Sequence, residues 1–96
     1  MFLNLNHKDL QVYKSSRELV KSCYRLTALL PTEEKFNLVS QIRRAALSVK
    51  LNIAEGSSRK SEVERKRFYE IARGSVIEVD AAIETAFDLG YFKRHN

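Results

Sequence analysis

Residues 36–56, FNLVSQIRRAALSVKLNIAEG, decide the fold, because they predict one long helix with apolar residues on two of its sides. The helical repeat of about 100° per residue gathers a core stripe on one side: Leu38, Ile42, Ala45, Ala46, Val49 and Ile53. One flank of this stripe is polar and ends at Glu55, and the other mixes Leu47 and Leu51 with basic residues. A helix of this kind belongs in the middle of a bundle.

The flanking sequence predicts a helix on each side of this one. A first helix is expected over about 8–30, capped by Asn6 and ended by Pro31. The central helix is then expected over about 33–55, with Thr32 as its amino-terminal cap and Gly56 as its left-handed terminator.

A third helix is expected over about 62–89. Ser61 and Glu64 form a capping-box pattern at its start, and Gly90 follows its end. Nothing in the chain alternates as a strand does. Three long helices with short turns predict a single all-α domain over 1–96, an antiparallel up-down bundle in which a fourth helix is short, missing or truncated.

Apolar residues lie beside the core stripes in greater number than three helices need. These candidate oligomer-interface residues are Phe36, Leu47, Leu51, Tyr69, Val76 and Phe87. We expect either a fourth helix or another subunit to cover them. A domain of 96 residues has a small core, so self-association is a reasonable source of further burial.

The net charge of +5 is concentrated in one part of the chain. Residues 43–73 carry nine Lys or Arg against four Glu, and the remainder is neutral. Such an excess favours polyanions, most often nucleic acid, or else provides a solvated, solubilising surface. The candidate nucleic-acid-binding residues are Arg43, Arg44, Lys50, Arg59, Lys60, Lys66 and Arg73.

The turn GSSRKS at residues 56–61 does not match a nucleotide-hydrolysing phosphate loop, because Arg59 stands where that pattern needs glycine. Free amides at the start of the third helix, with Arg59 and Lys60 beside them, suit a backbone phosphate or form an ordinary helix cap. No sequence signature of a base-reading module is present. Any nucleic-acid binding is therefore expected to be dominated by the backbone.

Other chemistry has little support in the sequence. The two histidines, His7 and His95, lie at opposite ends, and Cys23 falls on the core side of its helix, so no metal site, cofactor or catalytic residue is predicted. The apolar runs are too short to cross a membrane, and no secretory signal precedes the first helix. We expect a non-enzymatic cytoplasmic protein.

Several motifs resemble a known family. The run from Ser40 to Val49, SQIRRAALSV, is followed by NIAEGS at residues 52–57, RFYEIARGS at 67–75 and Glu78. HKDL at residues 7–10 also matches. Together they resemble, over nearly the whole chain, the bacterial four-helix-bundle proteins encoded in intervening sequences of 23S ribosomal RNA genes.

This resemblance implies a four-helix bundle without known enzymatic activity. A similar protein is the accessory factor of diversity-generating retroelements, which implies a homopentamer that associates with RNA or DNA and with a reverse transcriptase. Arg43, Arg44 and Arg73 match motif arginines. Two features depart from the family pattern: Lys50 replaces a common proline, and the sequence stops at Asn96 where members usually continue into a fourth helix.

Four polar residues are assigned a structural role: Gln41, Asn52, Glu55 and Glu78. We expect Asn52 and Glu55 to hydrogen-bond to a neighbouring helix or loop, and Glu55 or Glu78 to pair with a motif arginine. An acid–base pair of Glu55 and Glu78 is the enzymatic alternative. A purely structural or protein-binding oligomer is the alternative to nucleic-acid binding, and it predicts that Arg43 and Arg44 contact carboxylates.

Overall fold

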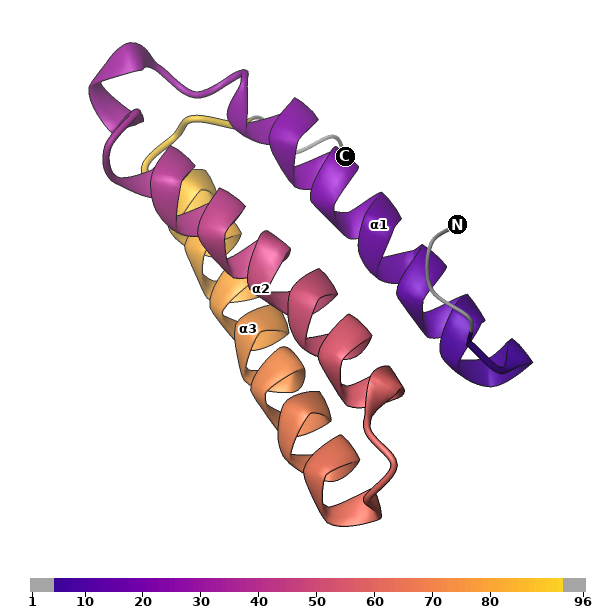
Figure 1. Cartoon of the computed structure of the whole chain (residues 1–96). Helices are drawn as coiled ribbons and strands as arrows, with labels where there is room; N and C mark the ends of the chain where they lie inside the picture. Colours follow the sequence, from indigo (N-terminus) through magenta and orange to yellow (C-terminus); the bar gives the residue numbers. More distant parts are fainter. Residues whose placement is uncertain (1–4, 93–96) are drawn as a thin grey trace.

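The computed structural model describes residues 5–92 and is all-helical over that range. It contains α1 (His7–Thr27), a short 3-10 turn η1 (Thr32–Glu34), α2 (Leu38–Ser58) and α3 (Glu62–Asp88). Helix α2 runs antiparallel to its two neighbours and packs against both (Figure 1). No Cα atom of α1 lies within 8 Å of one in α3. The expected up-down bundle is present, and α2 is its middle member.

The predicted caps form at two helix starts. The Asn6 side-chain oxygen accepts a hydrogen bond from the Asp9 amide at 2.9 Å at the start of α1. The Ser61 hydroxyl accepts from the Glu64 amide at 3.4 Å at the start of α3. Each cap satisfies one of the amides that a helix start leaves without an intrahelical partner.

The end of α3 is also as the sequence indicates. Gly90 adopts a left-handed conformation with φ of 81°, which glycine accepts without steric cost. The Gly90 amide donates to the Phe87 carbonyl at 2.9 Å and the Tyr91 amide to the Ala86 carbonyl at 3.0 Å. This paired pattern closes the helix and turns the following segment from α3 toward α1 (Figure 1).

The predicted boundary between the first two helices is wrong in detail. Helix α1 ends at Thr27 instead of Leu30, and α2 begins at Leu38, after the separate turn η1. Thr32 caps nothing with its side chain, and Asn37 has a non-helical backbone with φ of −126° and ψ of −98°.

One tertiary and one local hydrogen bond to the Glu34 side chain hold the chain in this break. Its carboxylate accepts from the Tyr91 hydroxyl at 2.7 Å and from the Asn37 side-chain amide at 3.2 Å. The bond to Glu34, together with burial, raises the pKa of Tyr91 to about 12. A contact 57 residues away therefore fixes η1 in place, and local propensity does not decide the helix start.

The prediction that Gly56 ends α2 as a left-handed terminator is also wrong. Gly56 lies inside α2, which continues to Ser58, and it does not have positive φ. A Cβ added to Gly56 would lie 2.9 Å from ring atoms of Tyr69 and 3.1 Å from the Phe68 Cβ. Glycine is needed at this position because α3 approaches α2 closely. It does not form a left-handed turn.

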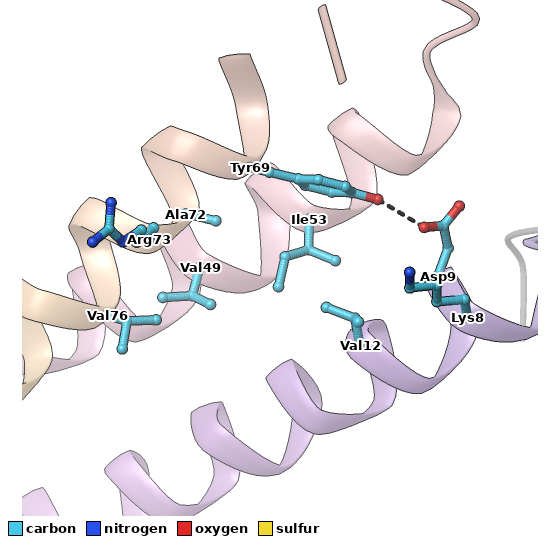
Figure 2. A pocket seen from close by; sticks show the side chains of 9 residues that line it. All are labelled: Lys8, Asp9, Val12, Val49, Ile53, Tyr69, Ala72, Arg73 and Val76. Carbon is cyan, nitrogen blue, oxygen red and sulfur yellow. Dashed lines mark hydrogen bonds between the residues drawn. The ribbon is translucent and has the colours of Figure 1, made fainter. Parts of the chain in front are cut away.

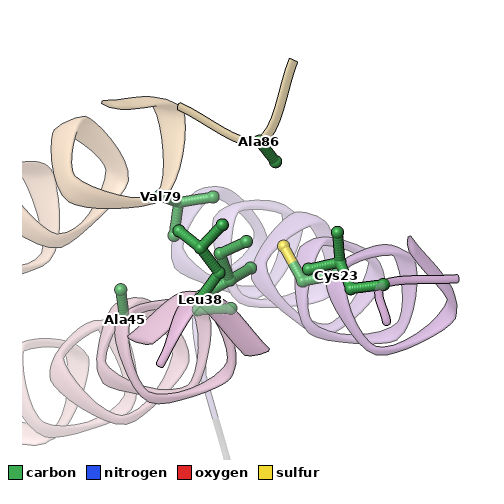
Figure 3. Packing of buried hydrophobic residues seen from close by; sticks show 8 residues of the cluster. Cys23, Leu38, Ala45, Val79 and Ala86 are labelled. Atoms are coloured by element: carbon green, nitrogen blue, oxygen red, sulfur yellow. The ribbon is translucent and has the colours of Figure 1, made fainter. Parts of the chain in front are cut away.

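The core follows the predicted stripe of α2. All six of its stripe residues are buried, and Ile42 and Ala46 are fully enclosed. Figure 3 shows Leu38 and Ala45 of α2 beside Val79 and Ala86 of α3, with Cys23 of α1 close by. Burial raises the pKa of the Cys23 thiol, in keeping with its predicted role as a small core residue.

Candidate nucleic-acid interface

One end of the bundle carries most of the predicted basic residues outside α2. The start of α1, the end of α2 and the start of α3 meet there, at the lower end of Figure 1. Lys8, Lys60 and Lys66 are exposed at this end, and Arg73 is exposed further along α3, at the twelfth residue of that helix. None of them forms an ion pair within the described residues, so their charges are available to an external anion.

Arg59 belongs to the same end but is partly engaged. Its guanidinium donates to the Glu55 carboxylate at 2.9 Å and lies 5.1 Å from the ring centre of Phe68. Both groups remain substantially exposed, at 43% for Arg59 and 54% for Glu55, so the pair contributes little stability. Its effect is to hold Arg59 against the turn between α2 and α3.

Arg43 differs from the prediction made for it. Its Nε donates to the Thr27 hydroxyl at 2.8 Å, and a terminal nitrogen donates to the Tyr24 carbonyl at 3.3 Å. The guanidinium also lies 4.4 Å from the ring centre of Tyr24. Arg43 therefore joins α2 to α1. The alternative of a structural oligomer predicted that Arg43 contacts a carboxylate, and this prediction is wrong because the acceptors are neutral oxygens.

The remaining basic residues of α2 lie apart from the basic end. Arg44 is exposed, and the Lys50 ammonium lies 6.0 Å from the ring centre of Tyr13. At a rise of about 1.5 Å per residue, Arg44 is roughly 20 Å along the axis from Arg59. The fold thus distributes the predicted basic set along α2, over the turn that precedes α3 and along the first half of α3.

An ion-pair network braces the basic end. Arg65 donates to the Asp9 carboxylate at 2.7 Å, and the Tyr69 hydroxyl donates to the other carboxylate oxygen at 3.0 Å. Arg65 also donates to the Ser57 and Arg59 carbonyls, at 3.2 and 3.3 Å, which satisfies acceptors at the end of α2. This network connects α1 with α3 across 56 residues of sequence.

The network determines the ionisation of Asp9. Burial opposes the charged form, but hydrogen bonds from Arg65, Tyr69 and Asn6 and the charge of Arg65 outweigh it, so the pKa of Asp9 is lowered. Asp9 enters the sequence motifs only as part of HKDL, and nothing near it in the chain indicates this network. Its partners are too distant in the chain for a local pattern to indicate them.

A groove lies next to this network and was not predicted either. It has a volume of about 400 Å³ and lies between α1 and α3, with α2 as its floor (Figure 2). The floor is formed by Val49 and Ile53, and Val12 and Val76 face it from the two walls. Lys8 and Arg73 stand at its edges.

The predicted structural polar residues form fewer bonds between helices than expected. Asn52 donates to the Ser48 carbonyl of its own helix at 2.8 Å, so the expected bond to a neighbouring element is wrong. The bond across the helices is made by Ser75, whose hydroxyl donates to that of Ser48 at 2.9 Å. Gln41 and Glu78 are exposed.

The geometry does not support an acid–base pair of Glu55 and Glu78. The Ser48–Ser75 bond fixes the antiparallel register of α2 and α3, and it places Glu78 about ten residues, roughly 15 Å, from the level of Glu55. Glu55 pairs with Arg59, which is not one of the motif arginines. Across residues 5–92, no three His, Cys, Asp or Glu gather where they could hold a metal ion.

The six predicted oligomer-interface residues do not form one surface. Leu47 and Leu51 lie on the outer side of α2, at 38% and 53% exposure. Tyr69 and Val76 line the groove. Phe36 is 89% exposed in the connection before α2, and the Phe87 ring packs edge-on against Phe92 at 5.3 Å.

The family comparison agrees with the motifs and the helical architecture. The model of the 23S rRNA-intervening sequence protein family matches residues 8–96, which is nearly the whole chain. The chain belongs to this family. A comparison of this family member with curated protein sequences gives no match. None of its described helices is long and apolar enough to cross a membrane.

Proposed function

We propose that this protein is a non-enzymatic, cytoplasmic accessory factor that binds the phosphate backbone of RNA or DNA with the basic end of its bundle. The observation that supports this proposal is the group of exposed cations Lys8, Lys60 and Lys66, which form no ion pair within the described residues, around two helix starts. Helix starts carry partial positive charge and free amides, which favour phosphate. The family resemblance implies a reverse transcriptase as its protein partner.

The proposed contact neutralises phosphates and does not read bases. If three or four cations engage a duplex, the logarithm of the association constant should fall with the logarithm of salt concentration with a slope of about −3. Filter binding of a structured RNA at several salt concentrations measures this slope. Undetectable binding at low salt would remove the nucleic-acid part of the proposal.

Charge-matched variants distinguish the basic end from overall charge. The double variant Lys60→Glu with Lys66→Glu should abolish most of the binding. The control, Lys14→Glu with Lys35→Glu, makes the same change in net charge at exposed sites elsewhere. Equal losses in both variants would show that binding follows net charge and that no defined site exists.

The second candidate function is that of a structural or protein-binding homo-oligomer. Leu47 and Leu51, exposed on α2, favour self-association through this side of the bundle. The family resemblance suggests a pentamer. Light scattering should give a mass above that of one chain, and Leu51→Asp should lower it. Leu29→Asp, at a residue 72% exposed outside the helices, is the matched control.

A further inference from the structure

Four large apolar side chains of α2 and α3 are exposed and lie outside the groove. Leu47 and Leu51 of α2 are 38% and 53% exposed, and Ile71 and Ile77 of α3 are 43% and 60% exposed. The helical repeat of about 100° per residue places each pair on one side of its own helix. Two neighbouring helices therefore each present an apolar pair to the outside.

The register of the two helices places these residues at matching heights. The Ser75 hydroxyl donates to that of Ser48 at 2.9 Å, so the two serines share one level along the bundle. At a rise of about 1.5 Å per residue, Leu47 lies within about 1.5 Å of the level of Ile77. Leu51 likewise lies within about 1.5 Å of the level of Ile71.

Opposite charges lie at matching heights on the same two helices. Arg44 of α2 lies within about 1.5 Å of the level of Glu78 of α3. Both residues are exposed, and neither forms an ion pair within residues 5–92. Their surroundings have the same signs: residues 38–54 carry three Lys or Arg and no carboxylate, and residues 74–88 carry four carboxylates and no Lys or Arg.

We propose that α2 of one copy of this chain packs against α3 of a second copy at equal height. Leu47 and Leu51 then contact Ile77 and Ile71 of the other copy, and Arg44 of the first copy faces the carboxylate at position 78 of the second. Rotation about an axis parallel to the helices keeps every residue at its own height and brings α2 antiparallel to α3 of the next copy. This inference rests on the proposed self-association and names its contact.

The chain itself supplies both complementary faces, which favours a second copy over an unrelated partner. A contact between the α2 helices of two copies buries Leu47 and Leu51, but it leaves the two isoleucines exposed and Glu78 without a partner. A contact between two α3 helices leaves the two leucines exposed. Of these three contacts, the one between α2 and α3 covers all four apolar side chains and places a cation opposite a carboxylate.

Charge exchange tests the pairing. Sedimentation equilibrium of the full chain measures the mass of the assembly and its dissociation constant. Arg44→Glu and Glu78→Arg should each raise this constant at least tenfold, because like charges then face each other across the contact. The double variant should restore the wild-type constant to within about threefold. Lys14→Glu, at an exposed α1 residue without an ion pair, changes net charge as Arg44→Glu does and should change the constant less than twofold.

The apolar part of the contact has its own matched pair of variants. Ile77→Asp should raise the dissociation constant at least tenfold. Val63→Asp makes the same kind of change on α3, at a side chain 80% exposed, and should change the constant less than twofold. The level of Val63 lies about 3 Å beyond that of Ser58, the last residue of α2, so no α2 residue faces it at equal height. Circular dichroism confirms that each variant is folded.

Mixing the two single charge variants distinguishes a contact between copies from one within a chain. Each variant supplies the charge that the other lacks, so an equimolar mixture should reach a mass that neither variant reaches alone. Restoration by the double variant without restoration by mixing would show that positions 44 and 78 interact inside one chain, and would overturn the proposal.

The remaining outcomes separate this contact from self-association in general. A wild-type chain that sediments as a monomer would remove the proposed self-association and this contact with it. An assembly unchanged by Arg44→Glu and Glu78→Arg would leave self-association in place and overturn this contact alone. Dissociation by Arg44→Glu, with no effect of Glu78→Arg or Ile77→Asp, would assign the contact to two α2 helices and would also overturn it.

Discussion

Substitution of the two helical glycines by alanine should change stability in opposite directions. Gly56 and Gly74 both lie inside helices, where alanine has the higher helix propensity by about 1 kcal/mol. A Cβ at Gly74 meets nothing within 4 Å, whereas a Cβ at Gly56 lies 2.9 Å from the Tyr69 ring. Gly74→Ala should therefore raise the free energy of unfolding by about 0.5–1 kcal/mol.

The Tyr69 ring cannot move away from Gly56 without cost. Its hydroxyl is bonded to Ser57 at 2.7 Å and to Asp9 at 3.0 Å, so a shift of the ring breaks bonds to two helices. Overpacking costs about 1–3 kcal/mol, and the bonds that hold the Tyr69 ring place the cost in the upper part of this range, above the gain in propensity. We expect Gly56→Ala to lower the free energy of unfolding by about 1–2 kcal/mol.

Thermal and urea unfolding at neutral pH measure both effects. In a domain of this size, 1 kcal/mol corresponds to a change in Tm of about 4–8 °C. The Tm should therefore fall by about 4–16 °C for Gly56→Ala and rise by a few degrees for Gly74→Ala. A rise for Gly56→Ala equal to that for Gly74→Ala would refute the close packing of α2 against α3 described above.

Three further predictions concern the charged contacts. Asp9→Asn should lower Tm more than Glu18→Gln, which removes only the exposed pair with Lys21; equal losses would contradict a bracing role. Because the folded pKa of Asp9 is lowered, its stabilising contribution is present above its ordinary value of about 3.9 and is lost as pH falls through the folded value. The Tm difference between the wild type and Asp9→Asn should thus be constant from pH 7 to about 5 and disappear at lower pH; a constant difference down to pH 2 would contradict this assignment. Arg43→Ala should lower the free energy of unfolding by about 1–2 kcal/mol, and Arg44→Ala should leave it nearly unchanged, as measured by urea unfolding.

The fold was predictable because its signals are local. The stripe from Leu38 to Ile53, the Asn6 and Ser61 caps and the Gly90 terminator each depend on residues within one or two helical turns. Periodicity and cap chemistry therefore indicated three helices and their faces correctly. The break before α2 depends on Glu34 and Tyr91, and no local pattern contains that contact.

The candidate site was less predictable for the same reason. The helical repeat groups Arg43 with Arg44 and Lys50 on one side of α2. It does not show that Arg43 reaches Tyr24 and Thr27 across the α1–α2 interface. The position of Gly56 after the helix expected over 33–55 predicted a left-handed terminator, although the packing of another helix explains that glycine. Residue type and charge identified the basic region, and the fold decides which of its side chains are exposed.

The most direct test of the basic end is to follow the backbone amide NMR signals of the full chain while a short RNA duplex is added at low salt. The account predicts that the largest shifts occur at residues 59–66 and around Lys8, and that they decrease as salt is raised. Shifts centred on the opposite end, around Arg25 and Lys35, or no shifts at all, would contradict it.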